Sequence, residues 1–304
     1  MTIAVSVVMI TYNHEEFVEE AIESILSQEC TFDFELVISD DKSPDGTKDK
    51  IEQIIQNHPK GNKIRFIPQD PNLGMMKNFG FALQQAKGEY IAICEGDDYW
   101  TDRTKLQKQF DILESNQNCV LSFHNATVYN QNTKESKAFN SYSKEFYTSD
   151  EMFDTWLIPT ASSFFRNVIP TELPDFLIEG THGDLALFLL LGESGSFHCT
   201  NEVMSVYRIN DQGVTQSGFK GIAHNLKHIK QLEDMELYFG EKHSNALNDR
   251  VALYNISNAM HYANCKQVKE SRSSLKKALK RKPSLRNKKA SFILRLFLKN
   301  ILNK

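Results

Sequence analysis

The sequence predicts an α/β protein whose central sheet is mostly parallel and flanked by helices, with a helical extension at the C-terminal end. Short apolar runs alternate with segments of helical spacing through residues 3–100, which is the pattern of repeated strand–helix units. Polar residues follow the ends of these apolar runs. From residue 222 onward the pattern is helical only. These observations predict one parallel sheet followed by a separate group of helices.

The first half of the chain contains four strand signals separated by amphipathic helices. Ser43 followed by Pro44 is typical of a helix start, because Ser accepts hydrogen bonds from free N–H groups and Pro fits the first helical position. Gly88 precedes the last of the four apolar runs. The predicted strands are residues 3–10, 34–39, 63–67 and 89–94, and the predicted helices are residues 15–28, 44–57 and 75–86.

The second half has weaker periodicity. Thr148 and Glu151 form a capping-box pattern, which predicts a short helix. Residues 185–191 are apolar on every side, so we expect a buried helix there. Gly240 is typical of a helix end. Further helices are predicted at residues 102–116, 222–239, 247–264, 268–281 and after Pro283, and further extended segments at residues 119–129, 160–166 and 204–208.

The composition is that of an ordinary globular chain, with 40% hydrophobic and 24% charged residues among 304. The five cysteines are scattered and form no Cys-x-x-Cys pair, so we expect reduced thiols rather than a zinc or redox site. No apolar stretch approaches the roughly 18 residues that span a bilayer. Residues 1–10 lack the basic leader and the cleavage site of a signal peptide. A cytoplasmic protein is therefore expected.

The end of the chain is basic, although the net charge of the whole chain is −4. Residues 266–304 are rich in Lys and Arg and contain one acid, Glu270. Residues 292–302 combine large apolar side chains with Lys and Arg, which is typical of helices that lie on an anionic membrane surface. The alternative is a helix that packs on the rest of the protein or on a second subunit. No aromatic and basic platform accompanies the tail, so nucleic acid is not an expected partner.

Polar segments follow the predicted strands at residues 11–13, 40–41, around Asn72 and at 95–98. Because the carboxyl ends of parallel strands meet at one edge of a sheet, we expect these segments to converge. Asp97 and Asp98 are adjacent carboxylates in the last segment. Carboxylates suit Mg²⁺ or Mn²⁺, which also takes phosphate oxygens from a bound diphosphate. The alternative is that both residues cap the following helix.

Four motifs, in this order and spacing, resemble glycosyltransferase family 2, the GT-A-fold enzymes of bacterial surface-polysaccharide synthesis. The most specific reads Glu-Gly-Asp-Asp-Tyr-Trp-Thr-Asp at residues 95–102. The resemblance runs from residue 3 to 218 and is strongest up to residue 116. The motifs lie at residues 7–13, 38–47, 72–91 and 95–109.

This resemblance implies a GT-A domain at residues 1–218 with two halves. Residues 1–100 would bind the nucleotide-sugar and residues 101–218 the acceptor, with acceptor loops expected at residues 130–146 and 167–180. Residues 219–304 would form the helical C-terminal extension with its basic amphipathic tail.

The resemblance also implies roles for individual residues. Thr11, Tyr12 and Asp41 would bind the nucleobase, for which Tyr12 offers an aromatic face and Asp41 a hydrogen-bond acceptor. Asp97 would approach the ribose or sugar, and Asp98 would ligate Mg²⁺ or Mn²⁺. The nucleotide-sugar site would also include Asn13, Asn72, Lys77, Asn78 and Arg208.

Each of these roles has a structural alternative. Tyr12 could pack on the core at a strand end, and the acids could be helix caps. Lys77 could be a solvated lysine at a helix start, and Arg208 could form a structural ion pair. Asn210 stands where the family commonly has His, which puts a metal or phosphate contact from that position in doubt.

An inverting sugar transfer also needs a general base for the acceptor hydroxyl. Asp184 matches the acid at the start of the corresponding helix in the family, and His182 two residues earlier is a departure from the family pattern. The alternative is that Asp184 only caps its helix.

Together these expectations describe a metal-dependent inverting glycosyltransferase. It would move a sugar from a nucleotide-sugar, with a UDP-sugar as the first candidate, to a saccharide or lipid-linked acceptor. The product would be a cell-surface polysaccharide such as the O-antigen of lipopolysaccharide or a capsule, made at the inner face of the cytoplasmic membrane. Two alternatives stay open: a non-catalytic nucleotide-sugar-binding or scaffold subunit, and a sugar nucleotidyltransferase. The latter is disfavoured because no Gly-rich phosphate loop follows the first strand.

Overall fold

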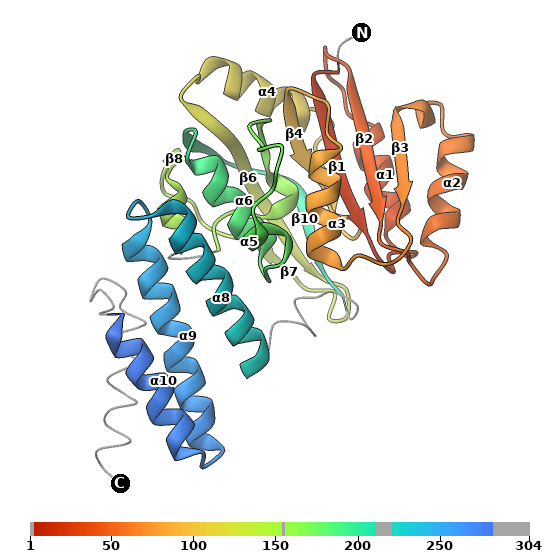
Figure 1. Ribbon diagram of the computed structural model, residues 1–304. Helices are drawn as coiled ribbons and strands as arrows, with labels where there is room; N and C mark the ends of the chain where they lie inside the picture. Colours follow the sequence, from red (N-terminus) through yellow and green to blue (C-terminus); the bar gives the residue numbers. More distant parts are fainter. Residues whose placement is uncertain (1–2, 154–155, 211–220, 282–304) are drawn as a thin grey trace.

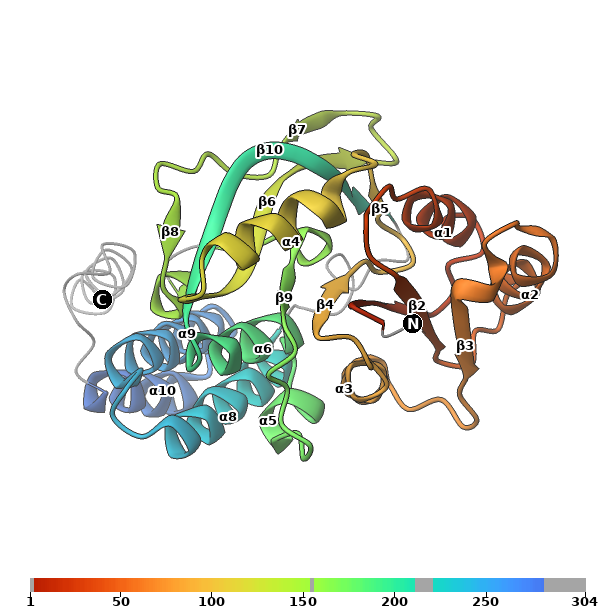
Figure 2. The same ribbon diagram turned by 90° about the horizontal axis from the view of Figure 1, so that it is seen from above.

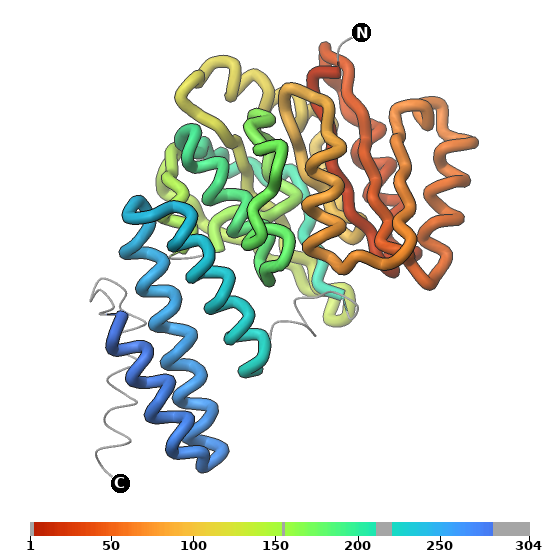
Figure 3. The backbone as a smooth tube through the Cα atoms, in the orientation of Figure 1, coloured from red at the N-terminus to blue at the C-terminus, as the bar shows by residue number. Residues whose placement is uncertain are grey.

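The computed structural model describes residues 3–153, 156–210 and 221–281 (Figure 1). One sheet with helices on both faces forms the larger part of the molecule, and three helices extend from one end of it (Figures 1 and 3). The helix predicted after Pro283 and the basic amphipathic tail lie outside the described residues.

Four parallel strands form the N-terminal half of the sheet. They are β1 (Val5–Thr11), β2 (Phe34–Asp40), β3 (Ile64–Pro68) and β4 (Tyr90–Ile93). β1 pairs with β2 on one side and β4 on the other, so Val5 lies opposite both Phe34 and Tyr90. Helices cover both faces of these strands, which explains why their sequences are continuous apolar runs rather than alternating patterns.

The second half of the sheet is mixed rather than parallel. Its strands are β5 (Tyr99–Trp100), β6 (Cys119–Asn130), β7 (Ser136–Ala138), β8 (Phe146–Tyr147), β9 (Phe164–Arg166) and β10 (Ser196–Ile209). The main strand order is β3-β2-β1-β4-β9-β6-β10-β5. β9 runs antiparallel to both β4 and β6, whereas β10 runs parallel to β6. The predicted parallel arrangement therefore holds for β1 to β4 and is interrupted at β9.

A different group of helices covers each face of the sheet (Figure 2). They are α1 (Val18–Leu26), α2 (Thr47–Asn57), α3 (Met75–Gln84), α4 (Lys105–Ser115), α5 (Asp175–Ile178) and α6 (Gly183–Gly192), with short 3-10 turns η1 (Gly61–Lys63), η2 (Ser149–Phe153) and η3 (Thr160–Ser162). α1, α2 and α4 share one buried apolar cluster with β1 and β2. α3, α5 and α6 share a second cluster on the opposite face. α6 is buried, as predicted.

The predicted start of the second helix is wrong by three residues. Ser43 does not cap a helix, because its hydroxyl donates to Asp40 Oδ1 at 2.5 Å and its N–H donates to Asp40 Oδ2 at 3.0 Å. The α2 helix begins at Thr47, whose N–H donates to Asp45 Oδ1 at 3.1 Å. The short helix predicted after Thr148 is the 3-10 turn η2, and one of the two hydrogen bonds of a capping box is present, since Glu151 Oε2 accepts the N–H of Thr148 at 3.0 Å.

Three helices form the C-terminal extension: α8 (Ile222–Phe239), α9 (Ser244–Asn264) and α10 (Val268–Lys280). α8 ends at Gly240, whose φ of 62° is in the region that favours glycine. His243 is buried and joins the extension to the sheet part by contacts with Asp150 and Glu193. Within the described ranges, none of the helices has both the length and the hydropathy needed to cross a bilayer.

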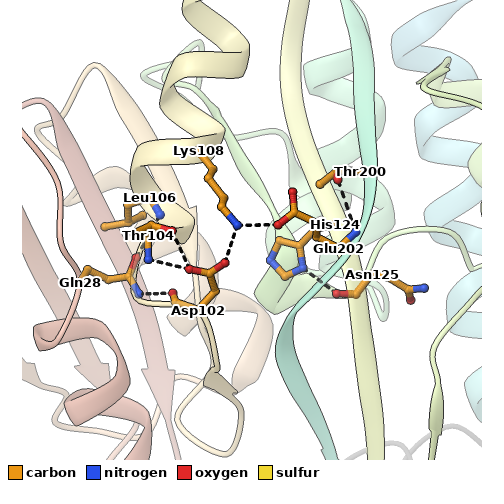
Figure 4. Close-up of polar contacts among 9 residues, drawn as sticks. All are labelled: Gln28, Asp102, Thr104, Leu106, Lys108, His124, Asn125, Thr200 and Glu202. Carbon is orange, nitrogen blue, oxygen red and sulfur yellow. Dashed lines mark hydrogen bonds and ion pairs between the residues drawn. The ribbon is translucent and has the colours of Figure 1, made fainter.

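Polar contacts hold the start of α4 (Figure 4). Asp102 accepts hydrogen bonds from the N–H of Thr104 and from Lys108 Nζ, both at 2.7 Å, and Lys108 also contacts Glu202 of β10. Lys105 on the same helix is fully buried. Its Nζ has no hydrogen-bond partner among the described residues and lies 4.0 Å from the centre of the Trp100 ring.

We expect Lys105→Met to stabilise the fold, most strongly at neutral and acidic pH. Burial lowers the pKa of Lys105 from 10.5 to about 7, and the opposing influence of Cys94 and Asp102 is smaller. Burial and the Lys105 charge also lower the pKa of His124, which faces it. Between pH 7 and 10.5 the unfolded chain therefore binds one more proton at Lys105 than the folded chain does. The lysine lowers the free energy of unfolding below pH 7, and this penalty fades as the pH rises toward 10.5.

Thermal unfolding of Lys105→Met and the unaltered chain at about pH 6.5 and about pH 9.5 checks this expectation. Each kcal/mol gained corresponds to about 2–4 °C in Tm, and we expect a gain of at least that size at the lower pH. The exposed Lys276→Met is the matched control and should leave Tm unchanged. A lower Tm for Lys105→Met at the lower pH, or equal gains at both, would contradict the assignment.

Candidate active site

A cavity of about 650 Å³ opens at the carboxyl ends of β1, β2 and β4. Residues at or just beyond the ends of these strands line it: Thr11 and Tyr12 at β1, Asp41 at β2, and Glu95 and Asp97 at β4. The start of α3, three residues of the segment 152–160, the start of α6, the end of β10 and one residue of α9 also line it. The structure thus brings together the segments that the sequence predicted to converge.

Thr11 and Tyr12 lie at one end of the cavity and differ in their exposure. Thr11 is buried and its hydroxyl donates to Asp40 Oδ1 at 2.8 Å, so it is fixed to the neighbouring strand. The side chain of Tyr12 is 50% exposed. An exposed aromatic face at a cavity is available for stacking on a planar ring such as a nucleobase.

Asp41 holds the loop that borders the same end of the cavity. Its carboxylate accepts the N–H groups of Leu73 at 2.6 Å and of Gly74 at 2.9 Å. The side-chain amide of Asn72 donates to the Asp41 carbonyl at 2.5 Å. Burial raises the pKa of Asp41, and these two N–H groups oppose the rise. Each carboxylate oxygen has a second lone pair, so Asp41 can still accept from a ligand.

Three other residues that were predicted to bind the nucleotide-sugar differ in whether they line the cavity. Asn78 lines the cavity, and its amide exchanges hydrogen bonds with Ser39 at 2.6 and 3.0 Å. Asn13 is not a lining residue; its φ is 60° and its N–H donates to Ser43 Oγ at 3.0 Å. Lys77 is not a lining residue either, because its Nζ is 2.8 Å from a carboxylate oxygen of Glu179.

The two adjacent aspartates after β4 occupy different environments. Asp97 lines the cavity, whereas Asp98 is buried and is not a lining residue. Asp98 Oδ1 accepts the N–H of Arg208 at 2.9 Å, and Oδ2 has no hydrogen-bond partner among the described residues. The geometry therefore gives Asp97, rather than the predicted Asp98, the position from which a carboxylate reaches a ligand in the cavity.

Negative charge accumulates around these aspartates. Burial, with the charges of Asp97 and Asp184, raises the pKa of Glu95 to about 8. Burial, with the charges of Asp97 and Glu95, raises the pKa of Asp98 well above its usual range. A cation placed among these carboxylates would stabilise their ionised forms.

Arg208 contacts the backbone of Asp97. Its Nη1 donates to the Asp97 carbonyl at 3.0 Å, and its Nη2 pairs with Glu20. The guanidinium lies 4.4 Å from the centre of the Tyr99 ring. The side-chain amide of Asn210 donates to Asp97 Oδ2 at 3.1 Å. Arg208 lines the cavity but forms the structural ion pair that was its alternative interpretation.

Asp184 lies at the start of α6 and lines the same cavity as Glu95 and Asp97. Its Oδ1 accepts the N–H of Leu185 at 2.8 Å, so it contributes to the helix start. Burial raises the pKa of Asp184, and the hydrogen bond with Leu185 opposes this rise. A partly buried carboxyl with a raised pKa in a cavity suits proton transfer better than an exposed cap does.

Comparison with known proteins identifies the family. The family described as "Glycosyl transferase family 2" matches residues 6–169, which is more than half of the chain. The chain belongs to glycosyl transferase family 2.

Relatives of this family 2 protein include bacterial proteins. An uncharacterized protein of Mycobacterium bovis is 31% identical over 225 residues, covering 70% of this chain and 61% of that protein. The chain thus spans less than two thirds of the length of this relative. TuaG of Bacillus subtilis, described as a putative teichuronic acid biosynthesis glycosyltransferase, is 27% identical over 220 residues, covering 71% of this chain and 83% of TuaG.

Solved structures show the same fold. TarS of S. aureus in complex with UDP-GlcNAc superposes with a TM-score of 0.60 at 17% identity, covering 90% of this chain and 91% of that one. The mannosyltransferase PcManGT of Pyrobaculum calidifontis, in complex with GDP-Man and Mn²⁺, superposes with a TM-score of 0.52 at 14% identity, covering 99% and 87%. The expected GT-A fold with C-terminal helices is confirmed.

The carboxylates of this family 2 protein fit a cation that is also bound by phosphate oxygens of a substrate better than a cation bound by protein side chains alone. In the described part of the chain, no three His, Cys, Asp or Glu side chains are grouped so that they could hold a metal ion. Mg²⁺ and Mn²⁺ are usually bound by one or two carboxylates together with phosphate oxygens of the substrate. Oδ2 of Asp98 has no hydrogen-bond partner among the described residues, and burial with the charges of Asp97 and Asp184 raises the pKa of Glu95, so a cation beside Asp97 would stabilise the ionised forms of these carboxylates.

The sequence did not predict several lining residues. His14 follows the predicted loop 11–13 directly, and its Nε2 is 3.9 Å from Asp97 Oδ2. Trp156, Tyr207 and Arg250 also line the cavity. The predicted acceptor loops at 130–146 and 167–180 contribute no lining residue. His14 could have been found from its place in the strand-end loop, whereas nothing near Arg250 in the sequence indicates a site.

Proposed function

We propose that this protein is a metal-dependent inverting glycosyltransferase of bacterial cell-surface polysaccharide synthesis. It would transfer a sugar from a nucleotide-sugar to a saccharide or lipid-linked acceptor. One observation carries the proposal: a single cavity brings Tyr12 and Asp41 together with Asp97 and Asp184. This arrangement supplies a place for a base, a carboxylate for a cation and a candidate general base. The catalytic unit would be residues 1–218, with the nucleotide-sugar half at 1–100 and the acceptor half at 101–218.

A UDP-sugar is the first candidate donor. WfaP of Escherichia coli, described as a UDP-Glc:α-D-GlcNAc-diphosphoundecaprenol β-1,3-glucosyltransferase, is 35% identical over 111 residues, covering 36% of this chain and 41% of WfaP. In our proposal Tyr12 stacks on the nucleobase, and Asp41 accepts a ring N–H from it. Thr11 and the loop around Asn72 complete this end of the cavity.

Asp97 would hold Mg²⁺ or Mn²⁺ together with the donor diphosphate. When bound, the cation would neutralise the charge that develops on the departing diphosphate. Asp98 would support this arrangement indirectly, because it accepts the N–H of Arg208, which in turn contacts the Asp97 carbonyl.

Asp184 would act as the general base. Its carboxylate takes the proton of the acceptor hydroxyl while that oxygen forms a bond to the anomeric carbon of the donor sugar. The bond between the anomeric carbon and the diphosphate oxygen breaks, and its electron pair leaves with the nucleoside diphosphate. Attack from the face opposite to the diphosphate inverts the anomeric configuration. The scaffold alternative required an Asp184 remote from the site, and Asp184 lines the cavity.

Calorimetric titration of the purified protein with UDP, GDP, dTDP and CDP, each with and without Mn²⁺, tests this proposal. We expect one nucleotide to bind with the metal and at least about tenfold more weakly without it, since the metal links Asp97 to the diphosphate. Asp41→Asn should weaken that binding, and the exposed Asp111→Asn is the matched control. Absence of binding for all four nucleotides under both conditions would refute the donor site.

A further inference from the structure

The helical extension places one cation in the cavity. Arg250 lies on α9 and lines the cavity together with Asp184 of α6. Leu247 and Val251, on either side of Arg250 along α9, belong to the same buried apolar cluster as α6. In Figures 1 and 2, α9 lies close to α6 at the end of the sheet part. The position of Arg250 is therefore fixed by packing of the extension against the wall that carries Asp184.

Among the described residues Arg250 forms no direct ion pair with a carboxylate, although its charge is close enough to Asp184 to oppose the rise in the pKa of that carboxyl. Its Nη1 donates to the Phe153 carbonyl at 2.8 Å, and its Nε is buried without a hydrogen-bond partner. The other arginines that bridge elements differ: Arg208 pairs with Glu20, and Arg281 pairs with two glutamates of α8. A partly buried guanidinium whose Nε has no hydrogen-bond partner is costly unless a ligand supplies one. The cavity is therefore suited to an anion at this end.

Aromatic side chains lie at the same end of the cavity. Trp156 and Tyr207 both line it, and their ring centres are 6.0 Å apart. Phe139 packs edge-on against both rings and holds them in place. Trp156 also hydrogen-bonds to Asp184. Aromatic rings beside a few convergent polar groups are typical of sites that bind small polar molecules, including sugar rings.

These neighbours surround the proposed base, so they would contact the acceptor rather than the donor. The donor diphosphate has its own proposed counter-charge in the cation at Asp97. A group that binds next to Asp184 must instead be part of the molecule whose hydroxyl Asp184 deprotonates.

We propose that Arg250 binds an oxyanion group of the acceptor, a carboxylate or a phosphate, next to the hydroxyl that Asp184 activates, while Trp156 and Tyr207 pack on the acceptor's sugar ring. This inference rests on the proposed function, because it assigns this end of the cavity to the acceptor. The extension thereby contributes to acceptor selection, and the acceptor is acidic. Guanidinium binds carboxylate and phosphate oxygens through two parallel hydrogen bonds, which gives the site a preference over neutral saccharides.

Tryptophan fluorescence offers a direct test, because the chain has two tryptophans and Trp100 is buried. The purified full chain, with Mn²⁺ and the nucleotide diphosphate that it binds, is titrated with methyl β-glucuronide, glycerol 1-phosphate and methyl β-glucoside. We expect at least one of the two anionic probes to change the fluorescence and the neutral glucoside to bind at least about tenfold more weakly. The probe that binds better identifies the oxyanion as carboxylate or phosphate.

Two substitutions and a control make the test specific. Arg250→Gln should weaken binding of the anionic probe at least about tenfold, and Arg250→Lys should restore part of it because the charge remains. The exposed Arg272→Gln is the matched control, and the Tm of each variant shows whether it folds. Equal binding of anionic and neutral probes, or a loss of nucleotide binding in Arg250→Gln, would overturn the proposal. Anionic-probe binding that depends on Arg250 without any nucleotide binding would support the anion site and refute the donor site.

Discussion

Asp97→Asn is expected to lower sugar transfer by about 10³-fold or more while the protein stays folded. Asp97 is the aspartate of the adjacent pair that lines the cavity, and its Oδ2 already accepts a hydrogen bond from Asn210. An amide has the same size but carries no negative charge, so it cannot bring a divalent cation to the donor diphosphate. Turnover of the nucleotide-sugar identified by the binding survey is the measurement.

Substitutions of two other aspartates show whether the loss of transfer is specific to Asp97 or follows from the removal of any acid. Asp98→Asn should also lower transfer, because Asp98 holds the Arg208 N–H behind Asp97, but it should retain metal-dependent nucleotide binding. Asp111→Asn on the exposed side of α4 should leave transfer unchanged. If Asp97→Asn kept full turnover and Asp98→Asn lost metal-dependent binding, Asp98 would be the metal ligand that the sequence predicted.

Asp184→Asn is expected to lower transfer by about 10²–10⁴-fold without weakening nucleotide binding. The carboxylate of Asp184 is the proposed acceptor of the hydroxyl proton, and an amide cannot take that proton. Asn retains a side-chain oxygen that can accept the N–H of Leu185, so the start of α6 should keep its geometry. The variant therefore separates the chemical step from folding.

Turnover and nucleotide affinity of Asp184→Asn, measured on the same preparation, check this expectation. Asp175→Asn, at the start of α5 and outside the cavity, is the control for removing an acid at a helix start. Turnover of Asp184→Asn within a few-fold of the unaltered chain would assign the proton transfer to another group, with Glu95 the next carboxylate in the cavity.

Local patterns in the sequence predicted the parts of the fold that depend on local chemistry. The apolar runs of β1 to β4 and the helical spacing of α8, ended by Gly240, are each set by residues close together in the chain. Tyr12, Asp41 and Asp97 converge because they follow neighbouring parallel strands, whose carboxyl ends lie at the same edge of the sheet.

The observed fold differs from the predicted one where a strand is too short to show a pattern or where a contact joins residues far apart in the sequence. β5, β7 and β8 contain two or three residues each, too few to show an alternating pattern. Ser43 was predicted to cap a helix because Pro44 follows it. Its hydrogen bond to Asp40 depends instead on how the chain turns at the end of β2, which this local pattern does not show. Arg250 reaches the cavity only because α9 folds back onto the wall beside α6, which no local pattern indicates.

The choice between Asp97 and Asp98 could not be made from their identity. They are the same residue type in adjacent positions, and the backbone turn after β4 buries one and leaves the other at the cavity. Chain geometry at a single turn thus decides which carboxylate can meet a ligand.

A crystal structure of the protein with Mn²⁺ and the bound nucleotide diphosphate would test the central claim most directly, since Mn²⁺ can be located by its anomalous scattering. The account predicts a Mn²⁺ peak at the Asp97 carboxylate, with the nucleobase between Tyr12 and Asp41 and the diphosphate oxygens on the metal. A nucleotide bound elsewhere, or a metal peak away from Asp97 and Asp98, would contradict it.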